Sequence, residues 1–137
     1  MVADIMENDS FHSELEELAR NLGVDLFGVA DLTGVHDFVL RQGGEHIAGF
    51  PRAISIGIRL LDSIVDELYR HEEPSAIYSY RGLYNSVNAS LDRATLLTAK
   101  KVQEAGFKAY PIPASQTARA RQANHPNVNK FLPRIVF

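Results

Sequence analysis

The best candidate for covalent chemistry is Ser55, in the string Ala53-Ile54-Ser55-Ile56-Gly57. The string resembles a nucleophile elbow, in which a serine hydroxyl is exposed at a sharp turn between a strand and a helix. Here isoleucines flank the serine on both sides, and Ile58 continues the apolar pattern. This pattern predicts the middle of a strand with Ser55 on its polar side, so we assign no catalytic residue.

The histidines do not have the spacing of a metal site. No two of them stand in an HExxH pattern or at another metal-binding spacing on one helix face. We therefore interpret them as surface residues and assign no metal ligand. A metal site formed by distant residues, with His36 and His46 on either side of the glycine loop, is the alternative. The five histidines are His12, His36, His46, His71 and His125.

Aromatic residues gather where a long helix is expected to begin. Tyr78, Tyr80 and Tyr84, with Arg81 among them, offer surfaces that stack on a planar ligand or a nucleobase. Tyrosines in an amphipathic helix also pack into cores, and we favour core packing for these three. Both interpretations stay open for the three tyrosines.

A second candidate for ligand contact follows the last predicted strand. In Pro111-Ile112-Pro113-Ala114-Ser115-Gln116, rigid prolines end the strand and small polar residues follow. Ligands of open α/β sheets bind beyond the carboxyl ends of strands. An ordinary connector has the same composition, so the segment favours neither interpretation.

These candidates must be positioned by alternating helices and strands. The periodicity predicts helices over 10–22, 35–40, 61–69 and 76–105 and strands over 24–30, 53–59 and 107–112. Ser10 is a suitable N-cap, and Gly23 and Gly106 are suitable C-terminal caps. We predict an α/β fold of βαβ units, with α+β as the alternative: a three- to four-stranded sheet covered by helices. The region 76–105 forms one long helix or two helices with a kink near Gly82.

Composition and charge divide the 137 residues into three parts. Residues 1–9 are expected to be a flexible tail, residues 10–117 one α/β domain, and residues 118–137 a basic, irregular extension with an apolar end. The net charge of −3 combines −8 over residues 1–105 with +5 over residues 106–137. The basic part either meets phosphates or folds back on the acidic body. The apolar residues at 131–137 need a cover, either as a late strand or in a contact between subunits.

Several classes of protein are excluded by composition. The chain has no cysteine, so it forms no disulfide and holds no thiolate-bound zinc or iron–sulfur cluster. No apolar run approaches the roughly 20 residues that span a bilayer, and the acidic N-terminus is not a secretory signal. We therefore expect a soluble, cytoplasmic protein.

Four strings together resemble the N-terminal region of epoxyqueuosine reductase and related cobalamin-dependent iron–sulfur proteins. They occur in the family's order and approximate spacing, and the resemblance covers about residues 10–117. The matching strings are residues 22–31, residues 50–60, the pattern Tyr84, Val87, Asn88, Leu91, Asp92, and residues 106–116.

The resemblance implies a module on the corrinoid side of such a reductase, without its cysteine-rich, ferredoxin-like part. It implies cobalamin as the ligand and a homodimer or a cysteine-rich redox partner. Binding of tRNA is a weaker implication, and no membrane contact is implied. A structural protein that self-associates without a cofactor is the alternative. The cofactor contacts we predict are Tyr84, Asn88, Ile112, Ala114, Ser115 and Gln116.

The chain departs from the family pattern after Gln116. The family's Gly-Trp-Ile-Gly-like motif is absent, and the chain contains no tryptophan at all. Residues 106–137 also hold no carboxylate, whereas the reductases place a catalytic acid shortly after the third strand. The proton donor of those enzymes is therefore missing, and we predict no reductase activity for this chain.

Overall fold

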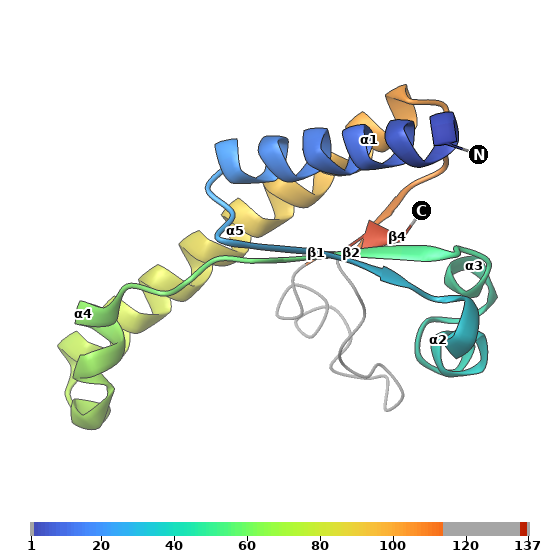
Figure 1. Ribbon diagram of the computed structural model, residues 1–137. Helices are drawn as coiled ribbons and strands as arrows, with labels where there is room; N and C mark the ends of the chain where they lie inside the picture. The colour runs from blue at the N-terminus through green and yellow to red at the C-terminus, as the bar shows by residue number, and fades with distance from the viewer. Residues whose placement is uncertain (1, 114–134, 137) are drawn as a thin grey trace.

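A small antiparallel sheet carries two long helices on one face in the computed structural model, which describes residues 2–113 and 135–136 (Figure 1). The elements in chain order are α1 (Val2–Asn21), β1 (Leu26–Asp31), η1 (Thr33–Val35), α2 (His36–Gly43), α3 (Glu45–Ala48), β2 (Arg52–Gly57), α4 (Asp62–Val65), η2 (Asp66–Arg70), α5 (Pro74–Glu104), β3 (Tyr110–Pro111) and β4 (Ile135–Val136). The predicted mixed fold, a small sheet covered by helices, is confirmed.

The strands lie in the order β1-β2-β4-β3, and each neighbouring pair is antiparallel. The prediction of a βαβ unit is therefore wrong for β1 and β2. The helices between these strands, α2 and α3, have eight and four residues. At about 12 Å and about 6 Å, neither helix spans the roughly 20 Å of a six-residue strand, and the chain turns back at the same end of the sheet. Strands β2 and β3 do run in the same direction, because both are antiparallel to β4, and α5 is the crossover between them.

The main core lies between the sheet and the two long helices. Ile54 and Ile56 of β2 point toward this layer, and Leu15 of α1 and Val102 of α5 meet them there. Leu15, Ile54 and Val102 are almost completely buried. Each such side chain contributes about 1.5–3 kcal/mol through its burial, so this layer is the main source of stability.

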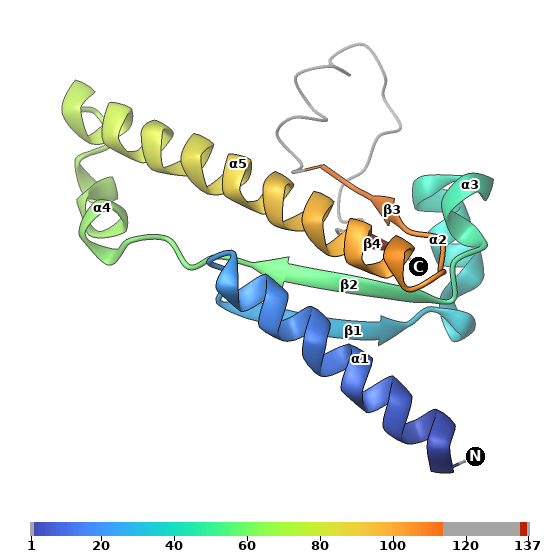
Figure 2. The ribbon, with the colours of Figure 1, turned by 90° about the horizontal axis from the view of Figure 1, so that it is seen from above.

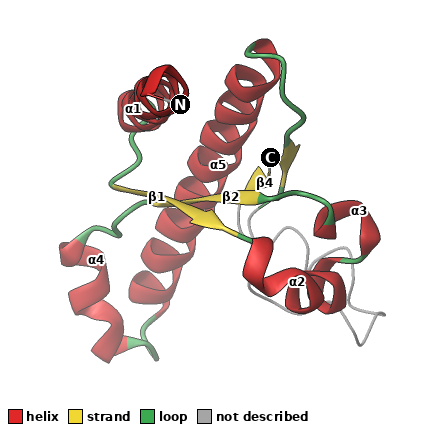
Figure 3. Ribbon diagram, turned by 45° about the vertical axis from the view of Figure 1, so that its right-hand side comes forward, coloured by secondary structure: helices red, strands yellow, loops and turns green. Residues whose placement is uncertain are grey.

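A second, smaller cluster lies at the end of the sheet that carries α2 and α3. Ala53 of β2 faces it, because successive residues of a strand point to opposite sides. Val39, Ile47 and Ala48 complete its buried part, and Ile112 packs against it. These contacts hold the two short helices on the sheet (Figure 3).

Several element boundaries differ from those expected. Helix α1 begins at Val2, within the stretch predicted to be a flexible tail, so the assignment of Ser10 as its N-cap is wrong. Gly23 and Gly106 have φ of +87° and +91° just beyond α1 and α5, which confirms both as C-terminal caps. Gly82 lies inside one continuous α5, so the kinked alternative is wrong.

The late part of the sheet is shorter than predicted. The third strand is reduced from residues 107–112 to Tyr110–Pro111, because a proline cannot donate a ladder hydrogen bond. The alternative of a late strand is confirmed for Ile135–Val136, which forms β4 between β2 and β3. The rest of the basic extension, residues 118–134 and 137, lies outside the described residues.

One part of the molecule projects from the sheet. We call it the arm: α4, η2 and residues 74–87 of α5 (Figures 1 and 2). Helix α5 has 31 residues and is about 46 Å long, more than twice the length of a six-residue strand. Its second half therefore packs on the sheet, whereas its first half extends past the end of β2.

Candidate functional site

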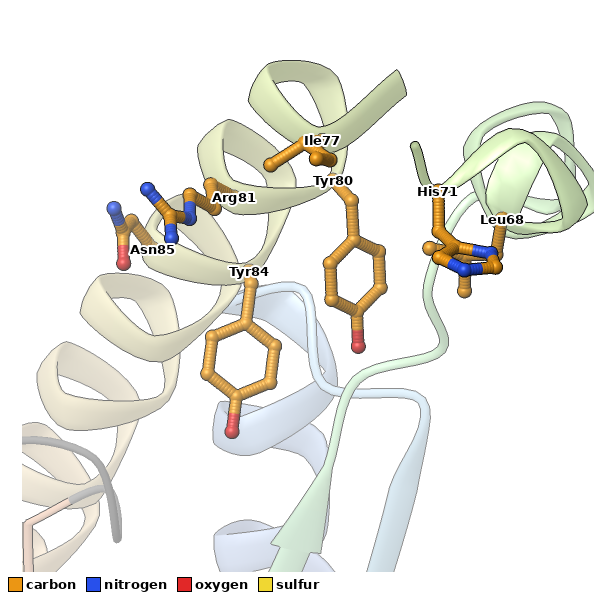
Figure 4. A pocket seen from close by; sticks show the side chains of 7 residues that line it. All are labelled: Leu68, His71, Ile77, Tyr80, Arg81, Tyr84 and Asn85. Carbon is orange, nitrogen blue, oxygen red and sulfur yellow. The ribbon is translucent and has the colours of Figure 1, made fainter. Parts of the chain in front are cut away.

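The arm contains an open groove of about 450 Å³ between η2 and the first half of α5 (Figure 4). Its walls are mostly apolar and aromatic, with a few polar groups, which is the usual composition of small-molecule sites. The groove is lined by Leu68, His71, Ile77, Tyr80, Arg81, Tyr84 and Asn85.

Two tyrosines form one wall of the groove. Tyr80 and Tyr84 are four residues apart on α5, so their side chains leave the same face of the helix. Their ring centroids are 5.9 Å apart with an interplanar angle of 32°, and both hydroxyls point in the same direction, away from the helix (Figure 4). Both side chains are half-buried. The pair therefore presents a continuous aromatic surface to an incoming ligand.

The opposite wall is positioned by ion pairs at the junction of η2 and α5. Arg70 donates hydrogen bonds from Nη1 to Glu67, at 2.9 Å, and from Nε to Glu73, at 2.8 Å. A further hydrogen bond joins Arg70 Nη2 to Glu73. Pro74 follows as the first residue of α5, where its fixed φ favours a helix start. These contacts fix the turn that brings Leu68 and His71 to face α5.

The same ion pairs change the acidity of their members. Hydrogen bonds from the Arg70 guanidinium lower the pKa of Glu73 below its ordinary value. The hydrogen bond and the negative charge of Glu73, and to a lesser extent those of Glu67, raise the pKa of Arg70. All three groups are exposed, so their effect on stability is small and falls with added salt.

Three polar residues on the rim can orient a ligand. Arg81 supplies a permanent positive charge and planar donors, Asn85 an amide, and His71 an imidazole. His71 faces α5 from η2, whereas Arg81 and Asn85 leave α5 on the side away from His71 (Figure 4). No carboxylate is among the residues that line the groove. The site is therefore suited to stacking on a flat apolar ring and to donating hydrogen bonds to oxygen atoms at its edge.

The predicted cofactor contacts do not all lie at one place in the structure. Tyr84 lines the groove, whereas Ile112 packs against the cluster around α2 and α3 at the far end of the sheet. Asn88 lies on α5 one turn beyond Tyr84 and is half-buried. Ala114, Ser115 and Gln116 lie outside the described residues. The structure therefore does not join Tyr84 and Ile112 in one site.

The preference for core packing of the tyrosines is wrong. Tyr78 is 71% exposed, and Tyr80 and Tyr84 border the groove instead of joining the buried cluster. The cause is the length of α5, which carries these residues beyond the sheet. Sequence reasoning also missed Leu68, His71 and Ile77. Ile77 could have been found, since it continues the spacing of Tyr80 and Tyr84, but the wall from η2 depends on tertiary structure.

Ser55 lies in the middle of β2, exposed and opposite Gly28 of β1, as the sequence predicted. The strand continues to Gly57, so no sharp turn presents the hydroxyl. Nδ1 of His36 lies 3.5 Å from Oδ1 of Asp37, and the ring of His46 packs against the ring of Tyr110. Among residues 2–113 and 135–136, no group of three or more His, Asp or Glu side chains is arranged to hold a metal ion.

Comparisons with protein-family models, with curated proteins and with solved structures find no match for this chain. Among the helices of the described residues, none combines the length and apolar character needed to cross a membrane. What the chain binds must therefore be argued from its own surfaces.

Proposed function

We propose that this chain is a non-catalytic binding module, akin to the corrinoid-side domain of epoxyqueuosine reductase-like proteins, and that it binds a corrinoid at the arm groove. The observation that carries the proposal is the half-buried Tyr80–Tyr84 wall, with ring centroids 5.9 Å apart, facing Leu68 and His71 across an open groove. Tyr84 is also one of the residues that the family resemblance picks out.

The chemistry of the groove suits a large, flat ring with polar substituents. Stacking on an aromatic side chain contributes about 1–3 kcal/mol for a nucleobase-sized ring. A corrin ring carries amide groups around its edge, and cobalamin carries a phosphodiester. Arg81 and Asn85 on the rim are suited to hydrogen-bond such oxygen atoms. The groove of about 450 Å³ is open, so it takes one face or edge of the ring, and the rest stays accessible to a partner subunit.

The test is a titration of the purified chain with cobalamin, followed by the visible absorption of the corrinoid. We expect a saturable spectral change, and Tyr84→Ala should weaken the binding about 5- to 150-fold, because it removes one stacking surface. The matched control is Tyr78→Ala, which truncates an exposed tyrosine outside the groove on the same helix. Absence of any spectral change, or equal binding by Tyr84→Ala and the natural chain, would refute the proposal.

An interaction protein without a cofactor is the second candidate. It is favoured by exposed apolar side chains on the arm and directly before it: Tyr69 of η2 is 77% exposed, and Leu61, the residue before α4, is 58% exposed. Exposed apolar patches of this kind often mark sites of contact between proteins. Two results together would support this candidate: the chain leaves the cobalamin spectrum unchanged, and it co-purifies with a protein. The Tyr69→Ser variant should lose that protein.

A further inference from the structure

The sheet has a face that points away from α1 and α5, and we call it the bare face. Ala53 of β2 lies on this face, toward the cluster of α2 and α3. Side chains alternate along a strand, and directly paired residues share a face, so Ser55 and its partner Gly28 lie there too. Both are exposed. Besides Ala53, the bare face consists of Leu26, Gly28, Ala30, Ser55 and Gly57.

The composition of the bare face is unusual for a sheet surface in water. The solvated side of an antiparallel sheet normally carries polar residues. Here Ser55 is the one polar residue and no residue is charged, while Leu26 is 69% exposed. Glycines within strands often mark a place where another segment approaches closely. The face therefore fits a cover of uncharged, largely apolar side chains.

The bare face is hollowed where its glycines lie. A hollow of about 380 Å³ is lined by Gly28, Ser55 and Gly57, with Leu26 beside them. A Cβ added at Gly28 would meet no described atom within 4 Å, and one added at Gly57 would lie 3.3 Å from Cδ1 of Leu26. Leu26 therefore leans over Gly57 and forms one side of the hollow. The hollow and the arm groove have no lining residue in common.

The directions of the strands bring the chain between β3 and β4 to the same place. Strand β4 is antiparallel to both β2 and β3, with Ile135 paired to Ile54 on one side and to Pro111 on the other. The residues after Pro111 and those before Ile135 therefore both leave the sheet toward Ser55 and the end of β2. Ile112 already packs against the cluster of α2 and α3, on the side of the bare face.

This connection is long enough to cover the bare face. Residues 114–134 lie outside the described residues, and half of them reach roughly 35 Å when extended, against roughly 20 Å for a six-residue strand. They include the apolar residues Phe131 and Leu132, which precede β4. Phe131 lies four residues before Ile135, a span of at most roughly 14 Å. Gly57 lies about 10 Å along β2 from the partner of Ile135.

We propose that the chain between β3 and β4 packs on the bare face of its own molecule, with Phe131 in the hollow beside Leu26. The face needs an apolar cover, and Phe131 needs burial. Both ends of the segment are fixed next to the face, so its effective concentration there is on the order of millimolar. A second copy or another protein at micromolar concentration competes only with an affinity about a thousandfold higher.

The first test measures how accessible the bare face is. The chain has no cysteine, so a single introduced thiol reports on its own position. Ser55→Cys places a thiol on the bare face, and the matched control Ser79→Cys places one on α5; the structure describes both serines as exposed. Each rate of reaction with iodoacetamide is divided by the rate of the same variant unfolded in urea.

We expect the thiol of Ser55→Cys to react at least about tenfold more slowly than that of Ser79→Cys on this scale. Adding Phe131→Ala to the Ser55→Cys chain should remove most of the protection, because it empties the hollow. Equal rates in the two single variants, or protection that survives Phe131→Ala, would overturn the proposal.

The second test asks which chain supplies the cover. Ser55→Cys combined with Leu132→Cys should form a disulfide within one chain under mild oxidation, because packing on the bare face brings the two Cα atoms within the roughly 7 Å that a disulfide needs. The matched pair Ser79→Cys with Leu132→Cys should stay reduced. Non-reducing electrophoresis separates the bonded single chain from a bonded dimer, and circular dichroism checks that both variants fold. A disulfide-linked dimer would assign the face to a second copy, and no disulfide in the folded Ser55–Leu132 variant would exclude the segment; either result overturns the proposal.

Discussion

The two halves of α5 have similar amphipathic patterns but different surroundings. From Leu91 to Val102 the apolar stripe is buried against the sheet and α1, and Ala94 is fully inaccessible. From Ile77 to Tyr84 a stripe with the same spacing borders an open groove, and of residues 74–87 only Ala76 is buried. The comparison teaches that the spacing of apolar residues identifies the apolar face of a helix. The length of the sheet decides how much of that face is buried in the core.

The largest expected difference between the halves is in stability. Leu91→Ala should lower the free energy of unfolding by about 2–5 kcal/mol, because it leaves a cavity in the main core. Ile77→Ala, which removes a half-buried side chain of the same size from the groove, should cost about 1 kcal/mol or less. Urea unfolding followed by circular dichroism measures both values. Equal costs would mean that the arm is as much part of the core as the body.

A smaller effect is expected in the packed half, where two threonine hydroxyls are buried. Oγ1 of Thr95 and of Thr98 has no hydrogen-bond partner among the described residues. Thr98→Val replaces the unpaired hydroxyl by a methyl group of similar size and should raise the free energy of unfolding by about 1 kcal/mol. The control Thr98→Ser keeps the hydroxyl and loses the methyl group, so it should lower stability. A destabilising Thr98→Val would show that this hydroxyl is bonded in the folded chain.

The smallest effect concerns the ion pairs of the arm. Arg70 lowers the pKa of Glu73, so Arg70→Gln should return that pKa toward its ordinary value, as measured by NMR titration of the Glu73 carboxyl. A carboxyl group whose pKa is lowered by folding stabilises the folded chain at pH values above its pKa in the unfolded chain. This stabilisation disappears as the pH falls through its pKa in the folded chain. The junction of η2 and α5 should therefore loosen in acid while the body keeps its structure. An unchanged pKa of Glu73 in the variant would exclude the pairing with Arg70.

Much of the helical structure follows from local signals in the sequence. The spacing of Leu91, Ala94, Thr98 and Val102 predicts α5 and its buried face, and Gly23 and Gly106 mark two helix ends. Such features depend on residues within a few positions of each other, so periodicity and cap chemistry are enough to find them. The middle of both long strands was found in the same way.

Strand pairing and the groove depend on contacts between distant residues. The direction of β2 relative to β1 is set by how α2 and α3 pack at the end of the sheet, which periodicity does not encode. The pairing of Ala53 with Val136 joins residues far apart in the chain. The groove needs Leu68 and Tyr84 to meet across a turn, so sequence patterns indicated the side on α5, with Tyr80, Arg81 and Tyr84, but not the wall from η2. The predicted contacts at Ala114, Ser115 and Gln116 remain predictions, because they lie outside the described residues.

The position of β4 has a consequence for the order in which the sheet assembles. Strands β1 and β2 are close in sequence and can pair early, whereas β3 has β4 as its neighbour in the sheet. Residues 135–136 must therefore arrive between β2 and β3 before β3 can join. Contacts across such long sequence separations slow folding, because the loop between them must close first. We expect a two-stage refolding reaction, in which the β1–β2 pair and its helices form fast and the β3–β4 side is completed later.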